Sequence, residues 1–428
     1  MLKKIGYESY KRIVEGRFLQ EVVRYAGLIV GLIIKFIMLI IKKIFFFIDF
    51  GIGIIGKYIL AKTTSVEKDK IMFLTFQGDY TCNPKKIADE IIKQDLDYKL
   101  VWDVKTPYPT NSYPLELKFA KHNTYEFYKE LASAKVIIEN TNIIERLGVY
   151  KKKNQYLLQT WHGSLGIKKL DGDVVMGFRW KRIARKCRKY VDYCLSNSTF
   201  ETEVFDSSYW KGVPSLLTGH ARNDVFFYGE EEKRKMRKKV SKFLEIAEDK
   251  KIFLFAPTHR DNVDEFYQSL DYENIREALK ERFGGEWHIV IRFHNRLRNG
   301  RETWMKRLSS HVSDATNYED MQELLVSTEA GATDYSSWIF DFMLSYKPGF
   351  IVEQDTDTFE KQRGFYYPIE TTPFSSANNS IELINNIRNF NDEKYQKDVE
   401  QFLKDKGCME DGHASERIVE KIIELMET

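Results

Sequence analysis

The sequence predicts an α/β fold with two domains and a cleft between them, preceded by a membrane-associated helical segment. Short apolar runs alternate with helical patterns from Lys70 onward, and the same alternation restarts after about residue 225. Such alternation favours mainly parallel sheets covered by helices. A chain of 428 residues is also too long for one hydrophobic core, because single cores stop growing at about 250–300 residues. The predicted boundaries are 1–66 for the N-terminal segment, 67–225 and 226–395 for the two domains, and 396–428 for C-terminal helices that pack back across them.

Each domain is assigned its elements from apolar runs and turn signals. We expect strands of the first domain within 71–76, 99–104, 135–140 and 155–160, and strands of the second within 251–258, 287–293, 330–335 and 349–354. Helices are expected at 83–94, 124–134 and 230–247. The first of these helices should have Asn83 as its N-cap and Pro84 at its first helical position.

The composition is that of a folded protein from a reducing compartment. Hydrophobic residues make up 43% and charged residues 30% of the chain, so disorder is not expected. Its four cysteines form no CxxC pair, which predicts neither a disulfide framework nor a structural zinc site. This cysteine pattern indicates a cytoplasmic location.

The N-terminal segment combines apolar length with positive charge. Residues 26–41 are apolar except for Lys35, but as a helix they rise about 24 Å, short of the roughly 30 Å hydrocarbon core. Lys35, Lys42 and Asp49 recur every seven residues, which places them on one polar stripe of an in-plane helix. Residues 1–62 carry a net charge of +7, against −4 for the rest, which favours an anionic membrane surface over nucleic acid. A span aided by flanking residues and a buried helical hairpin remain alternatives, whereas a cleaved signal peptide is not indicated.

Functional-looking residues follow three of the expected strands. Ligands of open α/β sheets bind beyond the carboxyl ends of the strands, so these positions predict one shared site. The residues are His162 after the first strand, Thr258, His259, Arg260 and Asp261 after the second, and Arg292 and His294 after the third.

The stretch 333–348 predicts a strand-to-helix turn. Ser336 or Ser337 can cap a helix whose apolar residues face the sheet, and such a turn can bind an anion. A plain helix cap is the alternative, but nearby Arg and His residues favour phosphate. The basic run at 179–190 is either a solvated helix face or a contact for lipid headgroups or an acceptor's pyrophosphate. Neither HExxH nor paired i, i+4 histidines occur, and GxSxG and Walker loops are also absent, so metal catalysis, an α/β-hydrolase and a P-loop kinase are disfavoured.

Seven motifs in order resemble the CDP-glycerol glycerophosphotransferase family, the teichoic-acid primases and polymerases. They are TWHGSLGIKKL, SNSTFETEVF, TGHARNDVFF, FLFAPTHRD, IRFHN, ELLVSTEAGATDYSSWIFDFMLSYKP and EKQRGFYYP, and they cover roughly residues 70–395. The resemblance implies a GT-B-like fold and transfer of glycerol phosphate from CDP-glycerol to a hydroxyl of a polyprenyl-pyrophosphate-linked acceptor at the cytoplasmic face of the membrane. No cofactor, metal or nucleic acid is implied beyond the CDP-alcohol donor.

The resemblance also implies roles for individual residues. His162 would be the general base, with His294 as a second catalytic residue. Donor or phosphate binding falls to Thr258, Arg260, Arg292, Asp334, Ser336, Ser337 and Arg363. Further cleft residues are Gly163, Lys168, Lys169, Asn223 and Asp224.

Some positions depart from the family pattern and leave alternatives open. The family usually has Tyr-Pro at His220-Ala221, an aromatic residue at His259, proline at Asn295 and Thr-Pro after the WHG element, so the donor could be CDP-glycerol, CDP-ribitol or another CDP-polyol. A GT-B glycosyltransferase using a nucleotide sugar and a non-catalytic scaffold are the competing functions. The short N-terminal segment slightly favours a primase or short-chain transferase. Teichoic acid, capsule and a homo-oligomeric state are left open.

Overall fold

The computed structural model describes residues 6, 15–16, 31–32, 34–40, 53, 55–105, 113–147, 151–170, 173–174, 186–258, 270–293, 305, 309–353 and 356–428. The chain divides into two compact units, Met1–Thr63 and Thr64–Thr428.

In the first unit, the described residues 34–40 and 55–63 are helical. Leu32, Phe36 and Leu39 of this unit are each more than half exposed. No helix within the described part of the chain is both long enough and apolar enough to cross a membrane. Two residues of the expected polar stripe, Lys42 and Asp49, lie outside the described residues.

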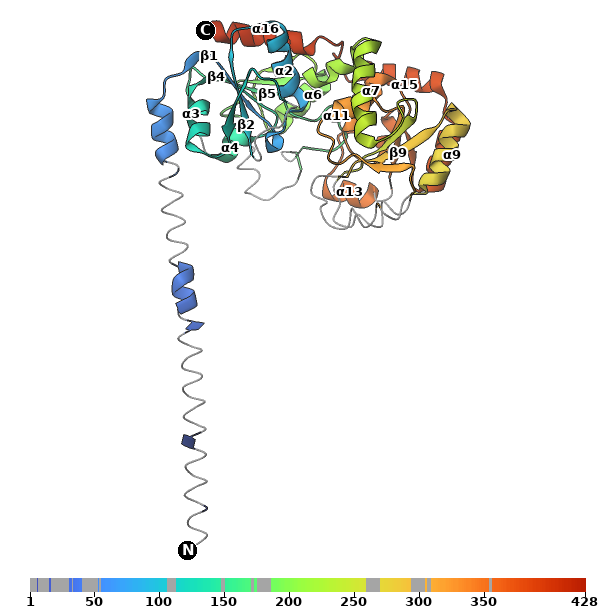
Figure 1. Cartoon of the computed structure of the whole chain (residues 1–428), viewed down its shortest axis with the longest axis horizontal. Helices are drawn as coiled ribbons and strands as arrows, with labels where there is room; N and C mark the ends of the chain where they lie inside the picture. Colours follow the sequence, from blue (N-terminus) through green and yellow to red (C-terminus); the bar gives the residue numbers. More distant parts are fainter. Residues whose placement is uncertain are drawn as a thin grey trace. The chain divides into compact units, whose positions relative to one another are not determined.

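The second unit contains two parallel sheets, coloured blue to green and yellow to red in Figure 1. The first sheet has the order β3-β2-β1-β4-β5-β6-β7, and all its strand pairs are parallel. Its strands are β1 (Glu67–Leu74), β2 (Lys99–Val104), β3 (Leu117–Lys121), β4 (Ala134–Glu139), β5 (Tyr156–Gln159), β6 (Tyr193–Ser196) and β7 (Ser215–Leu217).

The second sheet repeats this plan with the parallel order β10-β9-β8-β11-β12-β13. Its strands are β8 (Lys251–Phe255), β9 (Trp287–Ile291), β10 (Val312–Asp314), β11 (Ala330–Thr333), β12 (Gly349–Val352) and β13 (Ser375–Ala377). The second order corresponds to 3-2-1-4-5-6, the doubly wound Rossmann arrangement, and the first is the same order with a seventh strand added beside β6. This arrangement places a ligand crevice where the order reverses. The predicted α/β class with parallel sheets is therefore confirmed.

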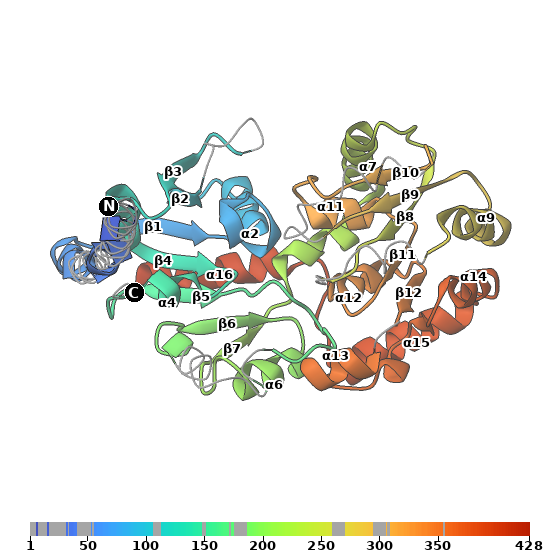
Figure 2. The same cartoon turned by 90° about the horizontal axis from the view of Figure 1, so that it is seen from below.

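Helices lie on both faces of each sheet (Figure 2). Those of the first half are α2 (Cys82–Lys93), α3 (Tyr125–Ser133), α4 (Ile143–Leu147) and α6 (Thr199–Ser207), followed by the 3₁₀ segment η2 (Ala221–Phe227). Those of the second half are α7 (Glu230–Leu244), α9 (Tyr272–Phe283), α11 (Met321–Val326), α12 (Trp338–Phe342), α13 (Thr356–Gln362), α14 (Ser380–Arg388) and α15 (Asp392–Asp405), and the last helix is α16 (Ala414–Glu427). Short 3₁₀ turns are η1 (Phe76–Gly78), η3 (Met343–Ser345) and η4 (Ile369–Thr371).

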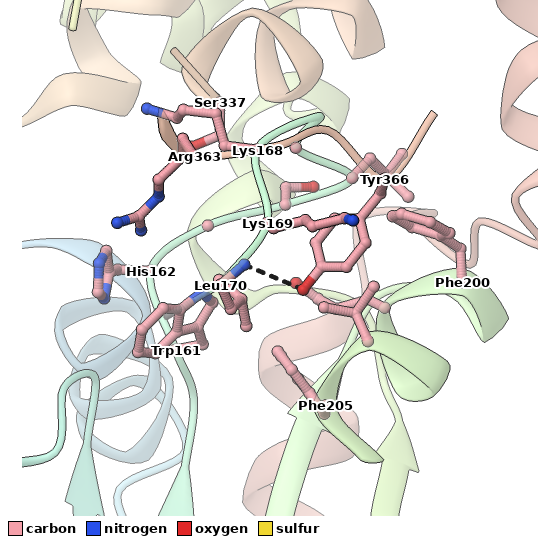
Figure 3. Close-up of a pocket in the computed structure, with 16 residues that line it drawn as sticks. Trp161, His162, Lys168, Lys169, Leu170, Phe200, Phe205, Ser337, Arg363 and Tyr366 are labelled. Carbon is pink, nitrogen blue, oxygen red and sulfur yellow. Dashed lines mark hydrogen bonds between the residues drawn. The ribbon is translucent and has the colours of Figure 1, made fainter. Parts of the chain in front are cut away.

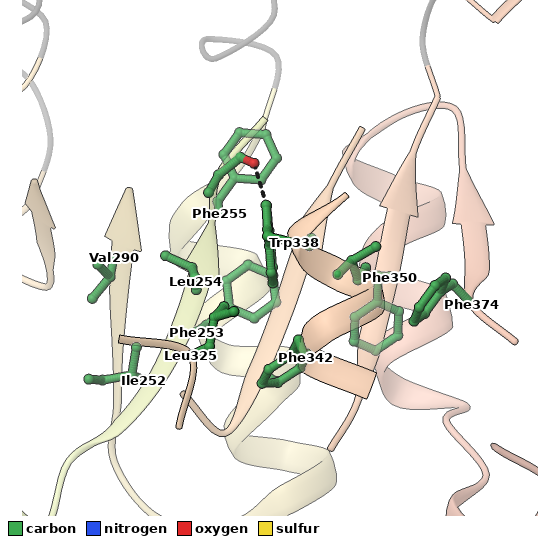
Figure 4. Close-up of a cluster of buried hydrophobic side chains, with 14 of the residues drawn as sticks. Ile252, Phe253, Leu254, Phe255, Val290, Leu325, Trp338, Phe342, Phe350 and Phe374 are labelled. Carbon is green, nitrogen blue, oxygen red and sulfur yellow. Dashed lines mark hydrogen bonds between the residues drawn. The ribbon is translucent and has the colours of Figure 1, made fainter. Parts of the chain in front are cut away.

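The strands are continuous apolar runs because helices cover both faces of the sheet. In β8, the four residues from Ile252 to Phe255 are fully buried and pack with Phe342 and Phe350 in the second core (Figure 4). The Trp338 indole donates a hydrogen bond to the carbonyl oxygen of Ala256 at 2.6 Å. A Cβ at Gly331 would lie 2.9 Å from the Trp338 ring, so only glycine lets α12 lie this close to β11.

The start of α2 differs from the sequence prediction. The helix begins at Cys82 with Thr81 as its N-cap, so Asn83 lies inside the first turn. The predicted Asn83 cap is wrong because the Asn83 side chain has another role. Its amide donates hydrogen bonds to the carbonyl oxygens of Thr160 at 3.0 Å and Trp161 at 3.2 Å, and thereby holds the end of β5.

The C-terminal helices belong to different halves of the second unit. Tyr395, Val399 and Phe402 of α15 pack in the core of the second sheet, whereas Ile418 and Ile422 of α16 pack in the core of the first. The chain therefore crosses between the halves in the loop from Lys406 to His413, and Figure 2 shows α16 lying along the first sheet.

Candidate active site

His162 lies just beyond the carboxyl end of β5, where the main chain turns sharply. Trp161 has a φ of 51°, a left-handed conformation that is uncommon for a bulky residue. Its backbone N–H is held by the side-chain oxygen of Gln159 at 2.9 Å, and its ring packs on the His162 imidazole with 4.2 Å between the centroids. These contacts fix an exposed imidazole at the end of the strand.

The hydrogen bond of His162 defines its neutral tautomer. Nδ1 lies 2.6 Å from the carbonyl oxygen of Asn140, the residue that follows β4. Because a carbonyl oxygen only accepts hydrogen bonds, Nδ1 must carry the proton. The lone pair of the neutral ring is then on Nε2, the nitrogen that can act as a base.

The segment after His162 runs from the first half of the unit to the second. The N–H of Tyr366 donates to the carbonyl oxygen of Ile167 at 2.8 Å, and the N–H of Lys169 donates to that of Gly364 at 3.1 Å. A Cβ at Gly166 would lie 3.0 Å from the Cβ of Ser337, so this glycine permits a close approach between the halves.

Arg222 joins the His162 segment to the second half, and the sequence alone did not identify it. Its guanidinium donates from Nε and Nη2 to the Asp341 carboxylate at 3.0 and 3.1 Å, and Nη2 also donates to the carbonyl oxygen of Gly163 at 2.7 Å. Arg222 and Asp341 are both buried. Nη1 of Arg222 is a buried donor with no hydrogen-bond partner among the described residues. A buried donor of this kind destabilises the fold unless a ligand accepts its hydrogen bond.

A cavity of about 690 Å³ lies between the two sheets, at the point where the strand order reverses. This volume suits a nucleotide-sized ligand. Cations, serines and aromatic residues line it together with carboxylates. The residues used below are His162, Arg222, Arg292, Ser336, Ser337 and Trp338.

The second sheet contributes Arg292 and the two serines to this cavity. Arg292 follows β9 and donates from Nη1 to the carbonyl oxygen of Tyr318 at 2.7 Å. Burial lowers its pKa, although a guanidinium in a protein keeps its charge. Ser337 is the N-cap of α12, but its side chain makes no capping hydrogen bond, so the predicted hydroxyl cap does not form.

Thr258 and Asp334 bind each other at the ends of β8 and β11. The N–H and hydroxyl of Thr258 donate to the buried Asp334 carboxylate at 2.8 and 2.5 Å. The carboxylate therefore orients the turn after β8, and Pro257 of that turn lines the large cavity. Four residues proposed from the sequence lie outside the described residues: His259, Arg260, Asp261 and His294. Residues 179–185 of the basic run also lie outside them.

Asn223 and Asp224 are buried in structural roles. Asp224 accepts from the N–H groups of Ala414 and Ser415 at 2.9 and 2.8 Å, so it caps the start of α16. Asn223 donates from its side-chain amide to Asp341 at 3.0 Å and to Glu410 at 2.9 Å. Asn223 thus supports Arg222 from behind.

A smaller cavity of about 190 Å³ lies on the other side of the His162 segment. Lys168, Lys169 and Arg363 line it, and His162 and Ser337 line both cavities. Figure 3 shows Arg363 with its guanidinium directed toward His162, and Trp161 beneath them. The structure therefore brings together His162, Gly163, Lys168, Lys169, Ser337 and Arg363, while Arg292 and Ser336 lie on the larger cavity.

Glu410, in the loop from Lys406 to His413, has a strongly raised pKa. Its Oε1 accepts from the side-chain amides of Asn197 at 3.0 Å and Asn223 at 2.9 Å. Burial raises the pKa of Glu410 from 4.5 to about 7, an effect that nearby His220 partly offsets.

We predict that Glu410→Gln removes a pH-dependent loss of stability. A folded-state pKa near 7 and an unfolded value near 4.5 mean that Glu410 favours the folded state fully below pH 4.5 and loses this contribution as the pH rises to 7. The variant should therefore exceed the wild type in free energy of unfolding by an amount that grows across this window, to at most about 3 kcal/mol. Urea unfolding of both proteins from pH 4.5 to 7.5 measures it, and a difference that is constant with pH would contradict the prediction.

Two Rossmann-type parallel sheets with a cavity between them define the chain as a GT-B-like α/β protein. The chain belongs to the CDP-glycerol:poly(glycerophosphate) glycerophosphotransferase family, whose model matches residues 57–424.

Curated relatives and solved structures agree with this assignment. The chain is 28% identical over 384 residues to a teichoic acid poly(glycerol phosphate) polymerase of Staphylococcus epidermidis, covering 83% of this chain but only 51% of that protein. It is 28% identical over 376 residues to a teichoic acid glycerol-phosphate transferase of Staphylococcus aureus, covering 83% and 93%. The solved wall teichoic acid polymerase TagF is 28% identical with a TM-score of 0.73, covering 85% of this chain and 90% of that one. The chain thus spans about half the length of the epidermidis polymerase.

Proposed function

We propose that the protein transfers glycerol phosphate, or another polyol phosphate, from a CDP-alcohol to a hydroxyl of a polyprenyl-pyrophosphate-linked acceptor. CMP is released, and the product belongs to teichoic acid or a related cell-surface polymer. The observation that carries this proposal is His162, held by Asn140 at the edge of a cavity that also contains Arg222 and Arg292. Family membership supplies the donor class.

The positions of these side chains support the following reaction. The acceptor hydroxyl attacks the β-phosphorus of the donor, and its proton passes to Nε2 of His162. The bond between that phosphorus and the bridging oxygen breaks, so CMP leaves with the electron pair. A positioned imidazole suits this proton transfer because a hydroxyl is a poor nucleophile at neutral pH.

Cations in the cavity stabilise the transferred phosphoryl group. Negative charge spreads over its oxygens during transfer, and donors already fixed in place stabilise it without reorganising. Nη1 of Arg222 is such a donor, since Asp341 and the Gly163 carbonyl already hold the other guanidinium nitrogens. Arg292, Ser336 and Ser337 are the further donors that we assign to the pyrophosphate, and Arg260 and His294 remain predictions from the family resemblance.

Nucleotide release tests the reaction. Purified protein is incubated with CDP-glycerol, CDP-ribitol, CDP-choline or a set of UDP-sugars, with and without a lipid-pyrophosphate disaccharide. We expect acceptor-dependent CMP from one CDP-alcohol. Acceptor-dependent release of UDP would instead support a nucleotide-sugar glycosyltransferase, and no release with any donor would support a non-catalytic scaffold.

We also propose that residues 1–62 attach the protein to the cytoplasmic face of the membrane as an in-plane segment. The excess of positive charge and the exposed apolar side chains of Leu32, Phe36 and Leu39 support this arrangement. The full chain should sediment with anionic vesicles, and Leu32→Asp with Phe36→Asp should weaken binding. Ile381→Asp, at an exposed position on α14, is the matched control. Equal sedimentation of all three proteins would exclude this mode of attachment.

A further inference from the structure

Glu410 lies where the chain crosses from the second half of the unit to the first. Its loop is held against the first sheet, because the N–H of Met409 donates to the carbonyl oxygen of Asn197 at 2.8 Å. Glu410 itself lines neither of the two cavities beside His162. Any effect of its carboxyl group on a ligand there must therefore pass through other side chains.

The first such connection leads to the segment that contains His162. The buried side-chain amide of Asn197 donates to Oε1 of Glu410 at 3.0 Å and to Oγ of Ser164 at 2.6 Å. Ser164 is buried and lies two positions after His162. The Asn197 amide nitrogen has two hydrogens, and these two contacts use both. Glu410 therefore fixes Asn197, which in turn holds the His162 segment.

The second connection leads to Arg222 on the cavity of about 690 Å³. The buried side-chain amide of Asn223 donates to Oε1 of Glu410 at 2.9 Å and to Oδ1 of Asp341 at 3.0 Å. Asp341 accepts two hydrogen bonds from Arg222, whose Nη1 has no partner among the described residues. One carboxyl group thus supports both the base and a cation that we assign to the transfer reaction.

The charge of Glu410 acts on the same network. The Asn223 amide lies between the carboxyl groups of Glu410 and Asp341, so ionisation of Glu410 places a second negative charge behind Arg222. Burial raises the pKa of Glu410 to about 7, and the group therefore changes charge near neutral pH. Other charged or titratable groups surround it from each neighbouring element: His220, Arg222 and Asp224 at η2, Glu201 of α6, Asp341 of α12, Arg417 of α16 and Cys408 of its own loop.

We propose that Glu410 is a positioning residue for the transfer reaction and that its uncharged form favours the anionic donor. The inference rests on the proposed function, which places the CDP-alcohol in the cavity lined by Arg222. Both phosphates of a CDP-alcohol are negatively charged, and a second carboxylate behind Arg222 opposes them through protein, where screening is weaker than in water. Donor affinity should therefore fall as the pH rises through 7 and Glu410 loses its proton.

Calorimetric titration of the full chain with CDP-glycerol at pH 6, 7 and 8 tests the inference. Glu410→Gln keeps an oxygen for Asn197 and Asn223 but cannot ionise. The affinity of this variant relative to wild type should rise at least about twofold from pH 6 to pH 8, because half a unit of coupling between the donor and the Glu410 pKa changes the affinity by up to about threefold. His162 and His220 are unchanged in the variant, so the ratio isolates Glu410.

Two further variants separate charge from position. Glu424→Gln, at an exposed carboxylate paired with Lys421, is the control, and its affinity relative to wild type should be constant with pH. Glu410→Ala removes the shared acceptor as well as the charge, so at pH 6 it should lower kcat for CMP release at least about tenfold. Glu410→Gln resembles the protonated residue and should keep at least half of the wild-type kcat at that pH.

Each result decides the inference. A relative affinity of Glu410→Gln that is constant with pH, or wild-type kcat in Glu410→Ala, would overturn it while leaving the transferase activity in place. The relative affinity of Glu410→Gln is decisive by itself where Glu410→Ala fails to fold. No binding of CDP-glycerol to the wild type or to any variant would overturn the proposed function itself.

Discussion

His162→Ala is expected to lower kcat by about 10²–10⁴-fold, the usual contribution of a positioned general base. The variant loses the Nε2 lone pair that receives the acceptor proton, and the side chain it removes is exposed and hydrogen-bonded to the Asn140 carbonyl oxygen. Folding and nucleotide binding should therefore be retained. CMP release measures kcat, and calorimetric titration with CDP-glycerol measures donor binding.

Two further variants separate the loss of the base from the loss of volume. His162→Gln keeps a side chain near Asn140 but cannot take up a proton at neutral pH, so its activity should be as low as that of the alanine variant. His413→Ala, at an exposed histidine paired with Glu416, should keep wild-type turnover. Turnover within a factor of two of wild type in His162→Ala would show that another group accepts the proton.

Arg222→Ala is expected to lower the free energy of unfolding by about 3–5 kcal/mol, the cost of removing one partner of a buried ion pair. Asp341, whose side chain is 6% exposed, would be left as a buried charge without its guanidinium. The Gly163 carbonyl would also lose its hydrogen bond from Nη2. Urea unfolding measures the change, and a loss below about 1 kcal/mol would contradict the buried pair.

The role of Arg222 in donor binding needs variants that stay folded. Asp341→Asn in the Arg222→Ala background removes the unpaired charge, so part of the stability should return while donor affinity stays low. Arg222→Lys keeps a positive charge but lacks the planar guanidinium that holds Asp341 and Gly163 together. Expressed as free energies, the loss in turnover should exceed the loss in free energy of unfolding. Wild-type affinity for CDP-glycerol in the stabilised double variant would exclude Arg222 from the donor site.

The sequence identified features whose signals are local. Runs of four to eight apolar residues, such as those of β4, β8 and β9, mark strands that helices bury on both faces, and restarting the pattern marks the second sheet. His162 and Arg292 could be expected at one site because each follows a strand, β5 of the first sheet and β9 of the second, and ligands of open α/β sheets bind beyond the carboxyl ends of the strands. Gly163, Lys168, Lys169, Ser337 and Arg363 were also named in advance, although the sequence did not place them in one cavity.

The tertiary structure decided which polar residues line the cleft and which pack behind it. The sequence predicted Asn83 as a helix cap and Asp224 as a cleft residue. In the structure, Asn83 binds the carbonyl oxygens at the end of β5, and Asp224 caps a helix that begins 190 positions later. Arg222 and Asp341 are 119 residues apart, and neither lies on a periodic pattern that predicts the other. Hydrophobic period and turn chemistry therefore determined the strands, the two halves and the position of His162, because these depend on neighbours in the chain. The Arg222–Asp341 pair, the role of Glu410 and the division into two cavities depend on contacts between distant segments, which only the folded chain brings together.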